Sequence, residues 1–433
     1  MAISTNKEKG VALLFYTFLL LHGLYAFTPL IRGMRIAMYI DFALVFFWAL
    51  IMLVNRKEYR LNRTIYSILL TAFIILAITV TYKLIGYSTA KIGACMRYFG
   101  FFAAIPLGCF FVENGSSKQK RLLLFFYSCV IVISVISNII VTMPFVGMGM
   151  GSEEINETAK TMHIPNFGDT SFTGYVFLCC IFYFVIVCYE KKWINRVVAL
   201  LIMAVCSYFT VICGMRGTTT ILLIIGVILV FITNFLHRWK VGNDVIIFTL
   251  FLIALVIYIN LEPIVELLVQ ISPSERLANR FNDFLYTSRH GIGEDSFTGR
   301  GELFKISISS FFRSPITFLF GIGEPLIEDD FIKAGVSGHS DILDILAKLG
   351  VFGCFFIFRC FHLYYQYMKK IYKRTIYRNI FIYVFWMVLI YGFLKTIFWE
   401  NFAIVTFIMF PLIFDILYTE NFVFTEHRYG NSN

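Results

Sequence analysis

Twelve long apolar runs constrain this chain more than any other feature. A helix needs about 20 mostly apolar residues to cross the hydrocarbon core of a bilayer. The runs lie at residues 11–31, 36–54, 65–82, 92–112, 122–146, 172–189, 194–213, 218–236, 245–261, 346–363, 380–397 and 402–417. Hydrophobic residues make up 59% of the chain, against about 45–50% in soluble domains. We therefore predict an all-α, polytopic integral membrane protein with about 12 transmembrane helices.

The basic residues between these runs predict the orientation of the chain. Lys and Arg are enriched in the cytoplasmic loops of membrane proteins. With the N-terminus inside, the cytoplasmic segments carry 20 Lys and Arg residues, and the short loops on the opposite side carry 7. We therefore expect residues 1–433 to form a single transmembrane domain with both termini in the cytoplasm. The net charge of +10 comes from these loops, so we predict no nucleic-acid partner.

This topology exports one long segment, residues 262–339, between the ninth and tenth spans. Loops beyond about 12–15 residues are usually functional or disordered. Ser272-Pro273-Ser274-Glu275 is a capping box followed by apolar residues at helical spacing, which predicts a short amphipathic helix on the membrane surface. A second helix is expected over 301–312, ended by Ser314-Pro315. We expect the chemistry on the extracytoplasmic face.

Several motifs of soluble enzymes are absent. The sequence contains no phosphate-binding glycine loop ending in Lys-Ser/Thr and no strand-led GxGxxG motif, which argues against ATP-driven transport and nucleotide cofactors. Asp329-Asp330, after Glu328, is the nearest thing to a divalent-metal site. Adjacent carboxylates in a loop are more often solvated, so we predict neither a metal nor another cofactor.

Arginines on the predicted outer side are the first candidates for function. Arg216 lies in Gly214-Met215-Arg216-Gly217 at the end of an apolar run, where a guanidinium is costly unless it has a role. Arg300 has a similar small-residue setting just before a helix, where backbone amides and a guanidinium can converge on an anion. The alternatives are an Arg216 that reaches lipid headgroups and an Arg300 that is solvated. Weaker candidates of the same kind are Arg276, Arg280 and Arg289.

His339 is the candidate acid–base group. It lies in Gly338-His339-Ser340-Asp341, just before the tenth run. Ser340 is placed to cap the following helix, Asp341 suits its first turn, and an imidazole there can accept a proton near neutral pH. A lone histidine at a helix entrance is more often structural. Asp344 and Lys348, four residues apart, predict an ion pair on one face of this helix.

Together these residues predict a cationic outer pocket with a proton acceptor at its edge. Such a pocket suits a lipid pyrophosphate, whose charge arginines must meet as it becomes a leaving group. It equally suits an anion channel or a transporter of anionic substrates.

The order of the motifs resembles the O-antigen polymerase and O-antigen ligase superfamily. The matching residues are Arg216, Thr298-Gly299-Arg300-Gly301-Glu302-Leu303-Phe304, Ser314-Pro315, Phe320-Gly321-Ile322-Gly323, Gly338-His339-Ser340-Asp341-Ile342-Leu343-Asp344 and Leu349-Gly350-Val351-Phe352-Gly353. Each motif is weak alone, and their order from Arg216 to Gly353 makes the match more specific. The first 200 residues match by hydropathy only.

The resemblance implies an inverting glycosyltransferase of the bacterial inner membrane that needs no metal or cofactor. Its donor and acceptor would be polyprenyl-pyrophosphate-linked oligosaccharides, and a chain-length regulator protein would be a candidate partner besides the membrane lipids. By position, Arg216 and Arg300 would hold the donor pyrophosphate. His339 would activate the acceptor hydroxyl, with Asp341 as its neighbour or as an alternative base. Arg276, Arg280 and Arg289 would be additional substrate-binding residues.

One departure from the family pattern favours a polymerase. Ligases that transfer finished glycan to a lipid core resemble His-Asn at this site, whereas His339-Ser340-Asp341 is more similar to polymerases of O-antigen, capsule or exopolysaccharide repeat units. The O-antigen ligase remains an alternative. A transporter of lipid-linked glycans or anions, from a different class, is expected to show internal repeats and paired interrupted helices, which we do not find in the sequence.

Overall fold

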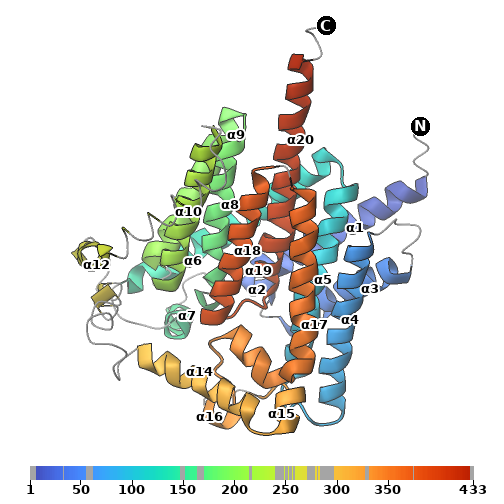
Figure 1. The fold of residues 1–433 in the computed structure, drawn as a ribbon, viewed down its shortest axis with the longest axis vertical. Coiled ribbons are helices and arrows are strands. Elements are labelled where there is room, and N and C mark those ends of the chain that lie inside the picture. Colours follow the sequence, from blue (N-terminus) through green and yellow to red (C-terminus); the bar gives the residue numbers. More distant parts are fainter. Residues whose placement is uncertain are drawn as a thin grey trace. The chain divides into compact units, whose positions relative to one another are not determined.

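The described part of the chain in the computed structural model is entirely helical in its regular structure (Figure 1). This part comprises residues 6–32, 34–54, 62–146, 152–162, 170–213, 217–238, 248, 252, 256, 259–270, 278–279, 281–282, 297–326, 331–373 and 375–429. The predicted all-α class is therefore confirmed for the residues that the structure describes.

Eight helices among the described residues are long and apolar enough to cross a membrane. They are α3 (Arg35–Val54), α4 (Arg63–Leu84), α5 (Ile92–Asn114), α6 (Ser117–Thr142) with η1 (Met143–Phe145), α9 (Trp193–Tyr208) with η3 (Phe209–Cys213), α10 (Gly217–Arg238), α18 (Tyr377–Leu394), and the continuous stretch of α19 (Glu400–Ile404), η4 (Val405–Met409) and α20 (Phe410–Tyr429). Each coincides with a predicted apolar run. These helices agree with a polytopic membrane protein.

The other four predicted spans have different outcomes. In α1 (Asn6–Phe27) and around α8 (Val176–Tyr189) the apolar stretch is shorter. The run at 245–261 lies mostly outside the described residues. The tenth run falls within α17 (Asp341–Ile371), a helix that is broken at Gly350. The number of twelve spans remains a prediction.

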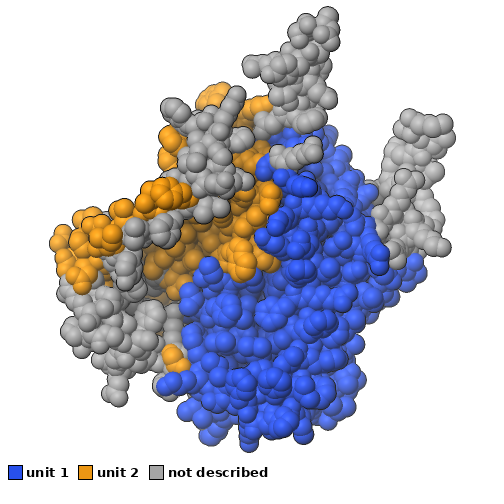
Figure 2. All heavy atoms as spheres, viewed as in Figure 1, with its two compact units in different colours: residues 1–131, 303–375, 388–433 blue, residues 132–302, 376–387 orange. Residues whose placement is uncertain are grey.

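The chain forms two compact units (Figure 2). Unit 1 comprises residues 1–131, 303–375 and 388–433, and unit 2 comprises residues 132–302 and 376–387. Unit 1 contains helices α1 to α5, including the short α2 (Pro29–Arg32), together with α15 (Pro315–Phe320), α16 (Phe331–Ala334), α17, α19, η4 and the described part of α20. Helices α6, α14 (Phe297–Phe312) and α18 contribute residues to both units.

Helix α5 is the centre of unit 1. It packs against α3, α4, α19, η4 and α20, and its apolar stretch is 83% buried. A helix that is apolar on all sides belongs in an interior. At Gly108 of α5, an added Cβ would lie 2.1 Å from the carbonyl oxygen of Phe407. Only glycine permits the two backbones to approach this closely.

A π-helical turn, η4, fixes α17 to this core. A π-helical turn interrupts the regular hydrogen-bond pattern of a helix and can leave a carbonyl available to another donor. Here the Tyr364 hydroxyl from α17 donates to the carbonyl of Thr406 at 3.3 Å. The Tyr364 ring packs edge-on against Phe407 with centroids 4.9 Å apart.

Unit 2 is built around α8, which packs against α9 and α10. It also contains α7 (Ser152–Thr161), η2 (Thr170–Tyr175) and α12 (Leu261–Gln270). A small apolar cluster of Val141, Phe145, Ile155 and Ala159 holds α7 against the end of the preceding helix. The segment 262–339, expected to be one long exported loop, thus includes most of α12 and all of α14, α15 and α16.

Candidate functional site

Helices α14 and α15 meet at a corner that the sequence predicts. The Ser314 side chain accepts a hydrogen bond from the Thr317 amide at 3.1 Å, and the Thr317 hydroxyl accepts one from the Ser314 amide at 2.9 Å. Pro315 occupies the first helical position, where its missing N–H costs nothing. The predicted end of the helix before Ser314-Pro315 is therefore confirmed.

The segment after α15 caps the first half of α17. The amide of Ile322 donates to the carbonyl of Ala347 at 2.8 Å, and the amide of Gly323 donates to that of Lys348 at 3.0 Å. The last carbonyls of a helix lack partners within it. Because the 322–323 amides satisfy these two carbonyls, α17 can break at Gly350 without leaving buried polar groups unpaired.

Two glycines allow the segment after α15 to pass close to α17 at its break. Gly350 has φ 61° and ψ −170°, a conformation that is essentially restricted to glycine. An added Cβ at Gly350 would lie 2.5 Å from backbone atoms of Leu319, and one at Gly321 would lie 2.3 Å from backbone atoms of Lys348. The glycines of the 320–323 and 349–353 motifs therefore pack against each other's segments.

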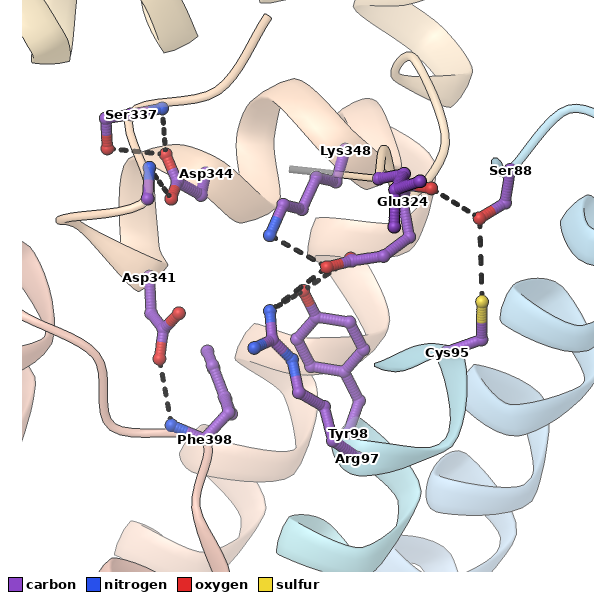
Figure 3. A network of polar contacts seen from close by, with 12 residues as sticks. Ser88, Cys95, Arg97, Tyr98, Glu324, Ser337, Asp341, Asp344, Lys348 and Phe398 are labelled. Carbon is purple, nitrogen blue, oxygen red and sulfur yellow. Dashed lines mark hydrogen bonds and ion pairs between the residues drawn. The ribbon is translucent and has the colours of Figure 1, made fainter. Parts of the chain in front are cut away.

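Glu324 directly follows Gly323 and lies at the centre of a buried polar network (Figure 3). Its carboxylate accepts hydrogen bonds from Lys348 Nζ at 2.9 Å, Arg97 Nη2 at 3.2 Å and the Tyr98 hydroxyl at 3.2 Å. Its backbone carbonyl accepts one from the Ser88 hydroxyl at 2.6 Å. The network thus joins α5, α17 and the turn after α4 around a single carboxylate.

The electrostatics of this network favour the ionised carboxylate. Burial alone would raise the pKa of Glu324, but the charges of Lys348 and Arg97 and their hydrogen bonds hold it below its ordinary value. A buried carboxylate is tolerated when it is paired and hydrogen-bonded. Glu324 meets both conditions, with two cations beside one anion.

The predicted ion pair between Asp344 and Lys348 is wrong. Lys348 binds Glu324, whereas the Asp344 carboxylate accepts four hydrogen bonds from other groups. These come from the Ser307 hydroxyl at 2.6 Å, the Ser337 amide and hydroxyl at 3.0 and 2.7 Å, and the Gly338 amide at 2.9 Å. Both side chains are buried, so partners from other segments replace the pairing along the helix.

Asp341 begins α17 and is also fixed by backbone amides. Its Oδ2 accepts hydrogen bonds from the amides of Ile397 and Phe398, the latter at 2.9 Å. Burial raises the pKa of Asp341, although the charge of Arg97 and the Phe398 amide act in the opposite direction. Ser340 caps the helix, as predicted, by accepting from the Leu343 amide at 3.3 Å.

His339 precedes these two fixed carboxylates in the sequence. Its amide donates to the Ser337 hydroxyl at 3.1 Å, and the residue is half-buried. Asp341 and Asp344 are 2% and 1% exposed. Within the 338–344 motif, His339 is therefore the most exposed titratable residue, while both acids bind backbone amides.

Of the predicted arginines, the structure describes only Arg300, and only its backbone. Arg216, Arg276, Arg280 and Arg289 lie outside the described residues, as do Glu328 and Asp329-Asp330. Helix α14 begins at Phe297, so Arg300 lies within its first turns and not just before the helix as predicted; its side chain is outside the described part. Among the predicted site residues, the structure thus describes the side chains of His339 and Asp341. In the described part of the chain, no group of His, Cys, Asp and Glu side chains is arranged to hold a metal ion.

The structure adds charged residues that the sequence reasoning missed. Arg97 and Glu324 form an ion pair, and Arg32 pairs with Glu400 at 2.9 Å. Asp41, to which we assign no role from the sequence, binds His22 Nδ1 at 2.8 Å. For Arg97, Asp41 and His22 the signal was present, because they lie inside apolar runs, where ionisable residues tend to be functional or paired. Their partners lie hundreds of residues away in two of these pairs, so spacing does not reveal them.

Neither a protein-family model nor a curated protein matches this chain.

Proposed function

We propose that this protein is a membrane-embedded polysaccharide polymerase that joins polyprenyl-pyrophosphate-linked repeat units. The observation that carries the proposal is the 338–344 motif at the start of α17. There the half-buried His339 follows the amides of Ser337 and Gly338, which the buried Asp344 carboxylate binds, and it precedes Asp341, whose buried carboxylate binds the Phe398 amide. The order of motifs that resembles the O-antigen polymerase and ligase superfamily supports the same conclusion, and so do the candidate membrane spans.

In this proposal the reaction is a single displacement. The acceptor hydroxyl oxygen attacks the anomeric carbon of the donor sugar as the bond from that carbon to the pyrophosphate oxygen breaks. The pyrophosphate leaves with the electron pair on the side opposite the attack, so the anomeric configuration inverts. The hydroxyl proton passes to His339, which Asp341 helps to position. Arg216 and Arg300 stabilise the charge on the departing pyrophosphate.

The proposed setting is the extracytoplasmic face of the bacterial inner membrane, with both termini in the cytoplasm. Donor and acceptor are then both lipid-linked oligosaccharides that reach the site from the bilayer. The product is an O-antigen, a capsule or an exopolysaccharide.

A gel of surface glycan tests this function in cells. We would compare a strain lacking the gene, the same strain with the gene restored, and the strain restored with Arg300→Ala. Loss of the long ladder with a single repeat unit still attached supports the polymerase. Complete loss of attached glycan, with lipid-linked polymer accumulating, indicates an O-antigen ligase. An unchanged ladder in the deletion strain contradicts both.

A transporter is the second candidate, and one observation favours it. Helix α17 is broken at Gly350, and broken helices are common in the ion and substrate sites of transporters. In transporters, however, the carbonyls freed by the break bind the ion. Here the amides of Ile322 and Gly323 occupy two of these carbonyls, which favours a structural role for the break.

A further inference from the structure

Arg97 has donors that the described residues leave unused. The hydrogen bonds that its guanidinium donates to described residues both come from Nη2, to Glu324 at 3.2 Å and to the Tyr98 hydroxyl at 3.4 Å. Its Nε is buried and has no acceptor among the described residues. The side chain as a whole is 18% exposed. A ligand cannot reach the buried Nε. The donor that it can reach is Nη1, which is not a buried atom and donates no hydrogen bond to a described residue.

The charge of Arg97 is also more than Glu324 requires. Glu324 is already paired with Lys348, whose side chain is 2% exposed and whose Nζ lies 2.9 Å from Oε1. Asp341 acts electrostatically on Arg97, but its Oδ2 binds the amides of Ile397 and Phe398. Glu324 therefore has two cationic partners, Lys348 and Arg97, for one negative charge.

Aromatic rings hold the Arg97 guanidinium in place. Its Cζ lies 5.2 Å from the centroid of the Tyr98 ring and 6.0 Å from that of Trp399. Arg32 lies over the same Trp399 ring at 4.4 Å and binds Glu400. Arginine stacks on aromatic faces by cation–π attraction. A guanidinium fixed in this way loses little conformational entropy when it binds a ligand.

We propose that the exposed part of the Arg97 guanidinium, at Nη1, binds a phosphoryl anion, namely the pyrophosphate of the lipid-linked donor. The planar donors of arginine match phosphate oxygens, and such charge-assisted pairs are strong. Arg97 Cζ lies 6.0 Å from the Trp399 ring, and the amide of the adjacent Phe398 donates to Asp341, two residues from His339 in the sequence. Arg97 is therefore near the start of α17, which carries the proposed acid–base group. The assignment to the donor rests on the proposed function. The binding of a phosphoryl group by Arg97 does not.

Binding to purified full-length protein in detergent tests this inference. The probes are inorganic pyrophosphate, farnesyl pyrophosphate and phosphatidylglycerol, and the variants are Arg97→Lys, Arg97→Gln and the control Arg313→Gln. Arg313 is an exposed arginine at the end of α14. We expect both Arg97 variants to weaken binding of the two pyrophosphates by about tenfold or more, and Arg313→Gln to leave it unchanged. Equal affinity in the wild type and Arg97→Lys overturns the inference.

Two further comparisons keep the result interpretable. Lysine at position 97 retains the charge beside Glu324 but lacks the planar donors, so it separates ligand binding from folding. If Arg97→Gln does not fold, Arg97→Lys alone carries the test, because it leaves Glu324 paired with Lys348, and the same loss of binding is expected. Equal competition by phosphatidylglycerol identifies a lipid headgroup and overturns the assignment to the donor. An unchanged glycan ladder in the deletion strain overturns the polymerase but not an Arg97-dependent affinity for pyrophosphate.

Discussion

At the scale of single residues, three buried carboxylates organise the start of α17. Glu324 binds two cations, whereas Asp341 and Asp344 bind mainly backbone amides and serine hydroxyls. The spacing of Asp344 and Lys348 predicts a pair along the helix, and this fails because the decisive partners, Ser307 and Glu324, come from other segments. Helical spacing reports neighbours within one helix only. The Ser340 cap is predicted correctly because its partner lies three residues away.

The double-mutant cycle of Asp344 and Lys348 checks this pairing. Asp344→Asn should lower the free energy of unfolding by about 2–3 kcal/mol because it weakens charge-assisted hydrogen bonds in a buried site. We expect Asp344→Asn and Lys348→Met to show a coupling energy below about 0.5 kcal/mol. Glu324→Gln and Lys348→Met should show a larger coupling, measured in the same way by unfolding in detergent. A strong coupling of Asp344 to Lys348 would contradict the described contacts.

Acid should destabilise the protein partly through Glu324. Its pKa is lowered in the folded state, so its contribution to stability is complete above the unfolded value of about 4.3 and is lost as the pH falls through the lowered value. Asp341, whose pKa is raised, acts in the opposite sense: its contribution is complete below its unfolded value and is lost as the pH rises through the folded one. Thermal unfolding between about pH 3 and pH 6 should therefore show a smaller loss at low pH in Glu324→Gln than in the wild type.

The glycan assay distinguishes the proposed role of His339 from that of Asp341. We expect His339→Gln to abolish the long ladder, because glutamine cannot accept the hydroxyl proton. Asp341→Asn should shorten the ladder without abolishing it, because the buried carboxylate positions the backbone and an amide oxygen can still accept from the Phe398 amide. The opposite pattern, a normal ladder in His339→Gln and none in Asp341→Asn, would make Asp341 the base. Membrane protein levels of both variants provide the control.

At the scale of elements, the break in α17 is the feature that is hardest to predict from the sequence. Gly350 lies inside an apolar run that reads as one continuous span. Its need for a positive φ arises from contact with the segment at Leu319 and Gly321, which lies about thirty residues earlier. By contrast, the end of α14 before Ser314-Pro315 and the start of α17 after Ser340 depend on local chemistry. Local signals therefore predict the helix ends, and tertiary contact decides the break.

Gly350→Ala measures the stability that is lost when a side chain is added where α17 passes close to Leu319. Alanine at Gly350 would have to adopt a glycine-only conformation, which costs about 1–3 kcal/mol, and its Cβ would also clash with the Leu319 backbone. We expect a clear fall in the melting temperature in detergent. The matched control is Gly100→Ala in α5, where no atom lies within 4 Å of the added Cβ. That variant should be neutral or slightly stabilised, because alanine favours helix over glycine.

At the scale of the whole molecule, the side of the membrane on which the later loops lie depends on whether the run at residues 245–261 crosses it. Helix α10 ends at Arg238 and α12 begins at Leu261, and most residues between them lie outside the described part. If the run crosses the membrane, Arg238 and Glu266 lie on opposite sides. If it does not, they lie on the same side, and the positive-inside assignment of every later loop is reversed.

Reporter fusions at these two positions decide between the topologies. We expect an alkaline phosphatase fusion after Glu266 to be active, because this enzyme folds only outside the cytoplasm, and a fluorescent-protein fusion after Arg238 to be bright. A fluorescent-protein fusion after Lys373 is a second test of the same alternative, since the five Lys and Arg residues between 369 and 378 predict a cytoplasmic position. An inactive phosphatase after Glu266 would place the segment 262–339, and with it the 338–344 motif, in the cytoplasm. A polymerase of exported lipid-linked units could not then use His339, so this topology is a condition of the proposed function.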